Sequence, residues 1–385
     1  MQSFPVSEPF KERRLGFLIN PIAGMGGKVG LKGTDGLSER AREMGAEPVA
    51  PKRAIEALRH PGLRGSALFL TASGDMGEDA LREAGLAHRV VHRANDPSGP
   101  EDTIAACQAF VLEGAELILF CGGDGTARNV AFASGETPIL GIPAGVKMHS
   151  GVFAVSPKTA AGLAFRYLNG ELQTRETEVA DVDEESYRSG VLQTRIYATA
   201  RTPYLPALVQ ERKQVYSSPN EDEFKREIAL FANEFMRDGS AYIMGAGTTT
   251  ESIAREMGVT KTLLGVDVVR EGETILMDAS ESDLLRLIGE IREEGARAMI
   301  IVSPIGAQGF VLGRGSQQIS ADVIRLAGPE NLIIVGTPHK LAELSHLLVD
   351  TGDFDLDCAL SGERQVVCGY RLAQRKKVIA AGDLL

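Results

Sequence analysis

The sequence is poor in cysteine and lacks long apolar runs. Its four cysteines are scattered along 385 residues without C-x-x-C spacing: Cys107, Cys121, Cys358 and Cys368. In a chain of this length, such thiols indicate neither a zinc site nor a disulfide framework, and we expect them to be buried and free. No segment approaches the ~20 apolar residues of a membrane span, and residues 1–14 lack the apolar core of a signal peptide. We therefore expect a cytoplasmic protein without a membrane partner.

Basic residues are also fewer than acidic ones. The chain has 41 Lys and Arg against 52 Asp and Glu, a net charge of -11, and its pI is near 5.2. Affinity for nucleic acid comes mostly from clustered basic residues, so this balance opposes a nucleic-acid partner. An anionic nucleotide would have to be held by local features of the chain.

Two common phosphate-binding motifs are absent as well. Neither G-x-x-x-x-G-K-[ST] nor G-x-G-x-x-G can be placed at a turn from a strand into a helix. A P-loop kinase and a plain Rossmann dehydrogenase are both disfavoured for this reason.

Short apolar runs that alternate with helical patterns favour a parallel α/β fold. The length and the 43% of hydrophobic residues favour two domains. In the first half we predict buried strands over residues 15–20, 66–72, 88–92, 116–121 and 138–143. A helix is predicted over residues 102–113, and Ser156-Pro157 is typical of an N-cap followed by proline at the start of a helix. We predict that an N-terminal α/β domain ends at residue 172.

From residue 173 the composition changes, and segments rich in β-branched residues follow. We interpret this change as the start of a second domain over residues 173–385. Asn220 and Glu223 indicate the start of a helix. Alternation then resumes, so the C-terminal domain mixes β segments with α/β alternation. Its further strands are predicted over residues 241–244, 263–269, 298–302 and 332–335 and its further helices over residues 282–294 and 321–326, while residues 361–364 resemble a turn between short strands.

The most informative segment is Gly122-Gly123-Asp124-Gly125-Thr126, which follows the apolar run 117–121 directly. A strand that passes through a glycine-rich turn into a helix presents main-chain N–H groups and the positive helix end to a phosphate. A carboxylate there disfavours phosphate by charge, so Asp124 needs another role, either holding Mg²⁺ or accepting a proton from an attacking hydroxyl. This combination suits phosphoryl transfer. The alternative is a purely structural role, in which the segment is a tight turn and Asp124 only caps the helix.

The G-G-D-G-T segment after an apolar strand resembles the hallmark of the NAD kinase, diacylglycerol kinase and sphingosine kinase superfamily. Asn20-Pro21-Ile22-Ala23-Gly24 is similar to the N-P-x-A-G turn of the same superfamily. Residues 26–36, the loop after Ile142 and the segment 245–250 resemble the ATP-NAD kinase-like branch, some members of which are named as acetoin-catabolism accessory proteins. The resemblance covers nearly the whole chain.

This resemblance implies a kinase that phosphorylates the 2′-hydroxyl of the adenosine ribose of NAD, with Asp124 as the base. It implies ATP or inorganic polyphosphate as the donor, with Mg²⁺, and a homo-oligomer. Better-known NAD kinases carry an Asn-Glu pair that contacts the nicotinamide half. Asp181 and Asp183 lie in the corresponding region by order, but no such pair can be placed.

The predicted site has one catalytic residue, Asp124, and no protein metal site. The residues predicted to bind the substrates are Asn20, Gly24, Lys32, Asp35, Gly122, Gly123, Gly125, Thr126, Gly145, His149, Gly245, Gly247, Thr248, Thr249 and Thr250. Lys28 and Lys32 belong to a glycine-rich loop from which a lysine can reach a donor phosphate. Arg314, between two glycines, is either an anion clamp or a solvated residue in a flexible connection.

Two further hypotheses stay open. A lipid or sphingoid-base kinase would use the same loop, although the acidic balance disfavours anionic membranes. A protein that binds NAD-like ligands without transferring phosphate would fit an accessory role.

Overall fold

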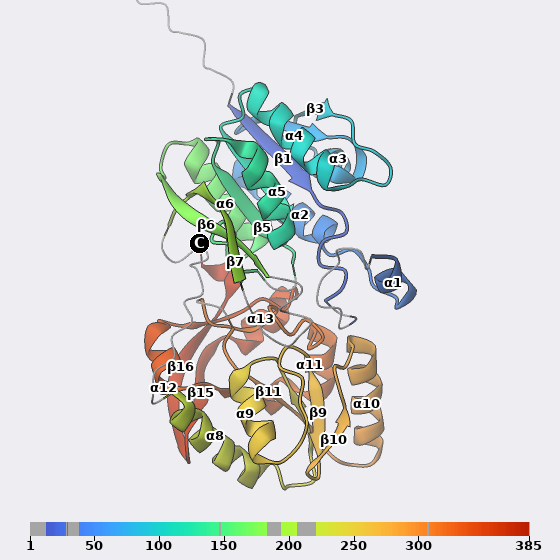
Figure 1. Ribbon diagram of the computed structural model, residues 1–385, viewed down its shortest axis with the longest axis vertical. Coiled ribbons are helices and arrows are strands. Elements are labelled where there is room, and N and C mark those ends of the chain that lie inside the picture. Colours follow the sequence, from blue (N-terminus) through green and yellow to red (C-terminus); the bar gives the residue numbers. More distant parts are fainter. Residues whose placement is uncertain are drawn as a thin grey trace, which may run out of the picture.

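The structure is a computed structural model that describes residues 13–27, 29, 38–145, 148–182, 194–205, 221–305 and 308–384. The chain forms two α/β units that lie one above the other (Figure 1). The first is built around a five-stranded sheet and the second around a nine-stranded sheet. The predicted two-domain α/β class is therefore confirmed.

The first unit contains a parallel sheet with the strand order β3-β2-β1-β4-β5. Its strands are β1 (Arg14–Ile19), β2 (Leu68–Ala72), β3 (His88–His92), β4 (Leu117–Gly122) and β5 (Ile139–Pro143). Its helices are α1 (Ser38–Glu43), α2 (Ala50–Leu58), α3 (Glu78–Ala84), α4 (Pro100–Leu112), α5 (Asp124–Ser134) and α6 (Pro157–Leu168), with the short 3₁₀ turns η1 (Pro61–Leu63) and η2 (Gly74–Met76). Ser156 caps α6 as predicted, because its hydroxyl accepts a hydrogen bond from the Thr159 N–H at 3.1 Å.

The strand β4, which lies between β1 and β5, is buried at all six positions because helices cover both faces of the sheet. Leu117, Leu119 and Cys121 face the core that includes α2 and α6, whereas Ile118 and Phe120 face the core that includes α4 and α5. Alternate side chains of a strand point to opposite faces, so both faces of β4 must be apolar. This burial fixes the end of β4 rigidly, and the G-G-D-G-T turn begins there.

An antiparallel hairpin of β6 (Thr174–Val182) and β7 (Thr194–Pro203) follows the first sheet. It packs on the first unit: Val179 belongs to the same core as α5, and the Gly151 N–H donates to the Glu178 carbonyl at 2.9 Å. The domain boundary at residues 172 and 173 stays a prediction. The hairpin itself lies with the residues that precede that boundary.

The second unit contains a mixed sheet with the order β10-β9-β8-β11-β13-β15-β16-β14-β12. Its strands are β8 (Ala241–Met244), β9 (Asp267–Arg270), β10 (Glu273–Leu276), β11 (Ala298–Val302), β12 (Phe310–Leu312), β13 (Leu332–Val335), β14 (Leu347–Val349), β15 (Gly362–Gly369) and β16 (Leu372–Ala380). Its helices are α8 (Glu221–Phe235), α9 (Thr248–Glu256), α10 (Glu281–Glu293), α11 (Ala321–Ala327), α12 (Pro338–Glu343) and α13 (Phe354–Leu360), with η3 (Pro329–Asn331) and η4 (Ala381–Asp383). Among the helices of the described residues, none is both long and apolar enough to cross a membrane.

Two local predictions are wrong in the second unit. Residues 362–364 do not form a turn but begin β15, which pairs with β16 from Gly362 opposite Val378 onward. The strand predicted over residues 263–269 begins only at Asp267, because the preceding chain is tied down by side chains: the Asp267 carboxylate accepts from the N–H of Thr262 at 3.0 Å. The helix start predicted at Asn220 lies outside the described residues.

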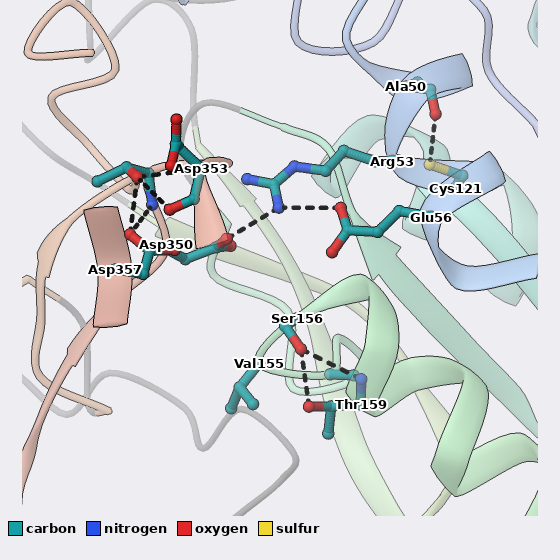
Figure 2. A network of polar contacts seen from close by, with 12 residues as sticks. Ala50, Arg53, Glu56, Cys121, Val155, Ser156, Thr159, Asp350, Asp353 and Asp357 are labelled. Carbon is teal, nitrogen blue, oxygen red and sulfur yellow. Dashed lines mark hydrogen bonds and ion pairs between the residues drawn. The ribbon is translucent and has the colours of Figure 1, made fainter. Parts of the chain in front are cut away.

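The two units are held together by a nearly buried ion pair (Figure 2). The guanidinium of Arg53 on α2 donates to the carboxylate of Asp350, which follows β14, at 2.9 Å, and the two side chains are only 15% and 10% exposed. Burial alone would lower the pKa of Arg53, but the charge and hydrogen bond of Asp350 outweigh it and hold that pKa above its ordinary value. The pair therefore links the units through a strong interaction between opposite charges.

Apolar and main-chain contacts add to this interface. Val155 of the first unit packs with Phe310, Leu348 and Ala381 of the second. The guanidinium of Arg314 donates to the carbonyl of Val155 at 2.8 Å. The C-terminal end of the chain also lies beside the first unit (Figure 1).

Removal of one partner of the Arg53–Asp350 pair should destabilise the protein, because the other charge is left nearly buried. We expect Arg53→Met to lower the free energy of unfolding by about 3 kcal/mol, and Arg53→Met combined with Asp350→Leu to recover most of that loss. Chemical denaturation checks this. As a control, Arg82→Met breaks ion pairs with Glu78 and Asp79 on the same helix, but the Arg82 side chain is 63% exposed, so the loss should be much smaller. Equal losses in Arg53→Met and Arg82→Met would contradict the assigned role.

Candidate functional site

The G-G-D-G-T turn connects β4 directly to α5, as the sequence predicts. Gly122 ends the strand, Gly123 precedes the helix, and Asp124 is the first residue of α5. A Cβ atom on Gly122 would lie 2.4 Å from the Thr126 hydroxyl oxygen, and a Cβ on Gly145 would lie 2.8 Å from the Gly123 Cα. The glycines are therefore required because main chain and side chains approach one another closely here.

The turns after three neighbouring strands meet at this edge of the sheet. The side-chain amide of Asn20, after β1, donates to the Thr126 hydroxyl at 2.9 Å. Gly24 of the same turn has φ +80°, and a Cβ there would lie 2.1 Å from the carbonyl oxygen of Ala144, after β5. The turns after β1, β4 and β5 thus form one continuous surface at the carboxyl ends of the strands, where ligands bind in open α/β sheets.

The carboxylate of Asp124 accepts three hydrogen bonds from the loop after β5. Its Oδ2 accepts from the His149 N–H at 2.6 Å, and its Oδ1 accepts from the Ser150 N–H at 3.0 Å and from the Ser150 hydroxyl at 2.6 Å. The residue is only 5% exposed. Asp124 is therefore held in one orientation by three donors.

Burial raises the pKa of Asp124 to about 7, because a charged carboxylate is poorly solvated inside the protein. The hydrogen bonds from Ser150 and His149 oppose that rise, and the charge of Asp181 adds to it. A carboxylate that titrates near neutral pH is suited to act as a general base. The electrostatics therefore favour the proton-accepting role of Asp124.

Ser150 is a member of the site that sequence reasoning missed. Its side chain is fully buried, and besides Asp124 it contacts β6, since its hydroxyl oxygen accepts the Ala180 N–H at 3.2 Å and lies 2.8 Å from the Ala180 carbonyl oxygen. A single serine in a loop carries no signal in the sequence, because its partner on β6 is 30 residues away. Only the fold brings the two together.

His149 contributes its main-chain N–H to Asp124, and its ring is half-buried. The prediction that His149 binds a ligand stays a prediction, as does that for Gly125. Lys32 and Asp35, like Lys28, lie outside the described residues.

The hairpin brings a charged pair next to Asp124. Arg128, one turn along α5, forms an ion pair with Asp181 of β6 at 3.4 Å, and its guanidinium lies 5.2 Å from the centre of the Tyr197 ring. Asp181 therefore belongs to the surroundings of Asp124, as its position in the sequence suggested. Asp183 lies outside the described residues.

The glycine- and threonine-rich turn of the second unit leads from β8 into α9. Thr250 is buried, and its hydroxyl donates to the carbonyls of Gly245 at 2.7 Å and Gly247 at 2.9 Å. Thr249 is buried too, whereas Thr248 is exposed. Of the three threonines, Thr250 therefore shapes the turn, and ligand binding by the three stays a prediction.

A short segment after β12 connects this turn to the first unit. The Ser316 hydroxyl accepts the Ala246 N–H at 3.1 Å, and the next side chain, Gln317, donates to the Gly145 carbonyl at 3.3 Å. Consecutive residues thus contact the Gly245 turn and the loop beside Asp124. The two glycine-rich turns lie on the two sides of one segment.

Arg314, in the same segment, is buried. Its guanidinium donates to the carbonyls of Ala154 and Val155 and lies 4.3 Å from the centre of the Phe310 ring. Burial lowers the pKa of Arg314 to about 10. The side chain joins the two units, so the alternative of a solvated arginine is wrong, and the anion clamp stays a hypothesis.

The described part of the chain holds no group of three or more His, Cys, Asp or Glu side chains that could bind a metal ion. The carboxylate oxygens of Asp124 are engaged by N–H and O–H donors.

Comparison with known proteins gives the family to which this fold and this loop belong. The model of the ATP-NAD kinase N-terminal domain matches residues 15–172, and that of the ATP-NAD kinase C-terminal domain matches residues 237–378. The chain belongs to the ATP-NAD kinase family. Membership supports a kinase that acts on NAD or a related substrate.

One relative and one solved structure complete the comparison. The chain is 24% identical over 277 residues to acetoin catabolism protein X of Cupriavidus necator; the match covers 70% of this chain and 60% of that protein. A Listeria monocytogenes protein assigned as a UDP-N-acetylglucosamine 2-epimerase matches 89% of this chain and 75% of its own at 10% identity, with a TM-score of 0.24. That likeness is too low to inform fold or function.

Replacement of Gly24 tests how tightly the turns after β1 and β5 are packed. Gly24→Ala should lower the free energy of unfolding by more than Gly65→Ala. Both glycines have positive φ, +80° and +74°, but the added Cβ meets the Ala144 carbonyl only at Gly24 and meets nothing within 4 Å at Gly65. Backbone strain alone costs about 1 kcal/mol or more at each site. Denaturant unfolding of both variants measures the difference, and equal losses would show that the turns are not in contact.

Proposed function

We propose that the protein transfers a phosphoryl group from ATP or inorganic polyphosphate to the 2′-hydroxyl of the adenosine ribose of NAD, which gives NADP. The observation that carries this proposal is the buried, hydrogen-bonded carboxylate of Asp124 at the start of α5. Family membership supports NAD or a related compound as the acceptor. The segment that links Gly145 to Ala246 supports one binding site shared by both units.

In this reaction the ribose hydroxyl oxygen attacks the terminal phosphorus of the donor and forms the new P–O bond. The bond from that phosphorus to the bridging oxygen breaks, and ADP or a shortened polyphosphate leaves. The proton of the ribose hydroxyl passes to the Asp124 carboxylate. The first N–H groups of α5 have no partner within the helix and carry its positive end, so they suit the phosphate oxygens.

We propose that Mg²⁺ enters with the donor, bound to its phosphate oxygens, where it neutralises negative charge. The donors that occupy both oxygens of Asp124 support a base rather than a metal ligand for this residue. Thr248, exposed at the start of α9, is the threonine that we propose for contact with the dinucleotide.

The proposal is tested by incubating the purified protein with NAD, Mg²⁺ and either ATP or polyphosphate, and by measuring NADP with an NADP-specific dehydrogenase. We expect NADP from at least one donor, and about a hundredfold or greater loss of turnover in Asp124→Asn. The amide of that variant faces the His149 N–H, so its thermal unfolding and NAD binding serve as controls for folding. Full activity in Asp124→Asn would exclude Asp124 as the base. If NAD stabilised the wild-type protein but neither donor gave NADP, the protein would be a binding protein rather than a kinase.

The pH dependence follows from the raised pKa of Asp124. Only the ionised carboxylate accepts a proton, so kcat/KM should rise with pH through about 7 and level off above it. Stability should change in the opposite sense: the folded protein favours the protonated form, so this contribution is complete below the unfolded pKa of 3.8 and is lost as pH rises through about 7. The difference in unfolding free energy between wild type and Asp124→Asn, measured from pH 5 to 8, isolates this residue. A flat difference would show that the Asp124 pKa is not raised.

A further inference from the structure

The hydroxyl of Ser150 lies between the carboxylate of Asp124 and the main chain of β6. Its oxygen is 2.6 Å from Asp124 Oδ1 and 2.8 Å from the carbonyl oxygen of Ala180, and it accepts the Ala180 N–H at 3.2 Å. The side chain is fully buried. The hydrogen bonds of this hydroxyl must therefore come from protein groups and not from solvent.

We propose that Ser150 is a positioning residue that keeps the Asp124 carboxyl group hydrogen-bonded in both of its protonation states. A serine hydroxyl has one proton and two lone pairs, and two acceptors lie within its reach. While Asp124 is ionised, the hydroxyl donates to Oδ1. When Asp124 has taken the substrate proton, its O–H donates to the Ser150 oxygen, and the Ser150 proton turns to the Ala180 carbonyl.

This exchange moves two hydrogen atoms by rotation and leaves every heavy atom in place. The His149 N–H stays bound to Oδ2 in both states. An unpaired buried donor or acceptor costs about 1–3 kcal/mol, so the Ser150 hydroxyl spares the Asp124 carboxyl group this penalty in both protonation states. The inference rests on the proposed role of Asp124 as the base.

The charged and titratable groups around this junction come from several elements. Asp181 lies on β6 next to Ala180, and Arg128 on α5 forms an ion pair with it. The His149 ring belongs to the same loop as Ser150, and the charges of Arg314 and Asp124 interact across the two units. Ser150 differs from all of them because it is neutral and contacts Asp124 directly.

The test compares Ser150→Ala with Ser156→Ala. Both replace a buried serine of the first unit, but Ser156 only caps α6. Titration of ¹³C-labelled aspartate carboxyls, with the Asp124 signal identified by its loss in Asp124→Asn, reads the pKa of Asp124 without an activity assay. In Ser150→Ala we expect this pKa to rise by about one pH unit, since the hydrogen bond that the hydroxyl donates to the charged carboxylate is stronger than the one it accepts from the neutral carboxyl group. Ser156→Ala should leave the pKa of Asp124 unchanged.

The kinetic readout follows the same logic. In Ser150→Ala the rise of kcat with pH should move upward by the same amount as the titration, and kcat should fall about fivefold at pH 7 with KM nearly unchanged. If Ser150→Ala does not fold, Ser150→Cys provides the same test, with a weaker donor of similar size and a smaller upward shift. An unchanged Asp124 titration in the folded variant would overturn the proposal, even if NADP is formed. A shifted titration in a protein that forms no NADP would support the role of Ser150 and reject the kinase function separately.

Discussion

The hydrogen bonds from His149 and Ser150 to the Asp124 carboxylate are the interaction on which the rest of the site depends. They tie the start of α5 to the loop after β5, and through Ser150 to the hairpin that begins with β6. Burial opposes ionisation of Asp124, whereas these donors favour it, and the balance holds the pKa of Asp124 at about 7. Neither effect alone would give a carboxylate that is both fixed in place and able to exchange a proton near neutral pH.

The frame around this carboxylate explains why the chain needs two units. The turns after β1, β4 and β5 pack so closely that main-chain atoms of neighbouring turns are in contact, and together they form one side of the site. Ser316 and Gln317 connect the glycine-rich turn of the second unit to these turns. Arg53, Asp350 and Arg314 hold the two units in this arrangement. In the proposed function, this shared surface would contact the dinucleotide from both sides.

Much of this architecture can be predicted from the sequence. The apolar run before Gly122, the three glycines and the polar Asp124 define a strand, a turn and a helix from local pattern alone. Ser156 before Pro157 likewise marks a helix start by local chemistry. At these two places, where the partners are close in sequence, pattern and structure agree.

The features that escape prediction depend on contacts between distant segments. Ser150 acquires its role only because β6 returns to the loop after β5. Arg314 resembles a solvated residue in its glycine-rich surroundings, yet it is buried against carbonyls 160 and 159 residues earlier in the chain. Residues 362–364 resemble a turn by composition, and only the pairing of β15 with β16 makes them a strand.

The central claim is that the Asp124 carboxylate receives the proton of the ribose hydroxyl of NAD. A crystal structure of the protein with NAD and a non-hydrolysable ATP analogue tests it most directly. The claim predicts the 2′-oxygen of the adenosine ribose about 2.6–3.2 Å from a carboxylate oxygen of Asp124, with the terminal phosphate of the analogue in line with that oxygen. An adenosine ribose bound away from Asp124, with the carboxylate still covered by His149 and Ser150, would contradict it.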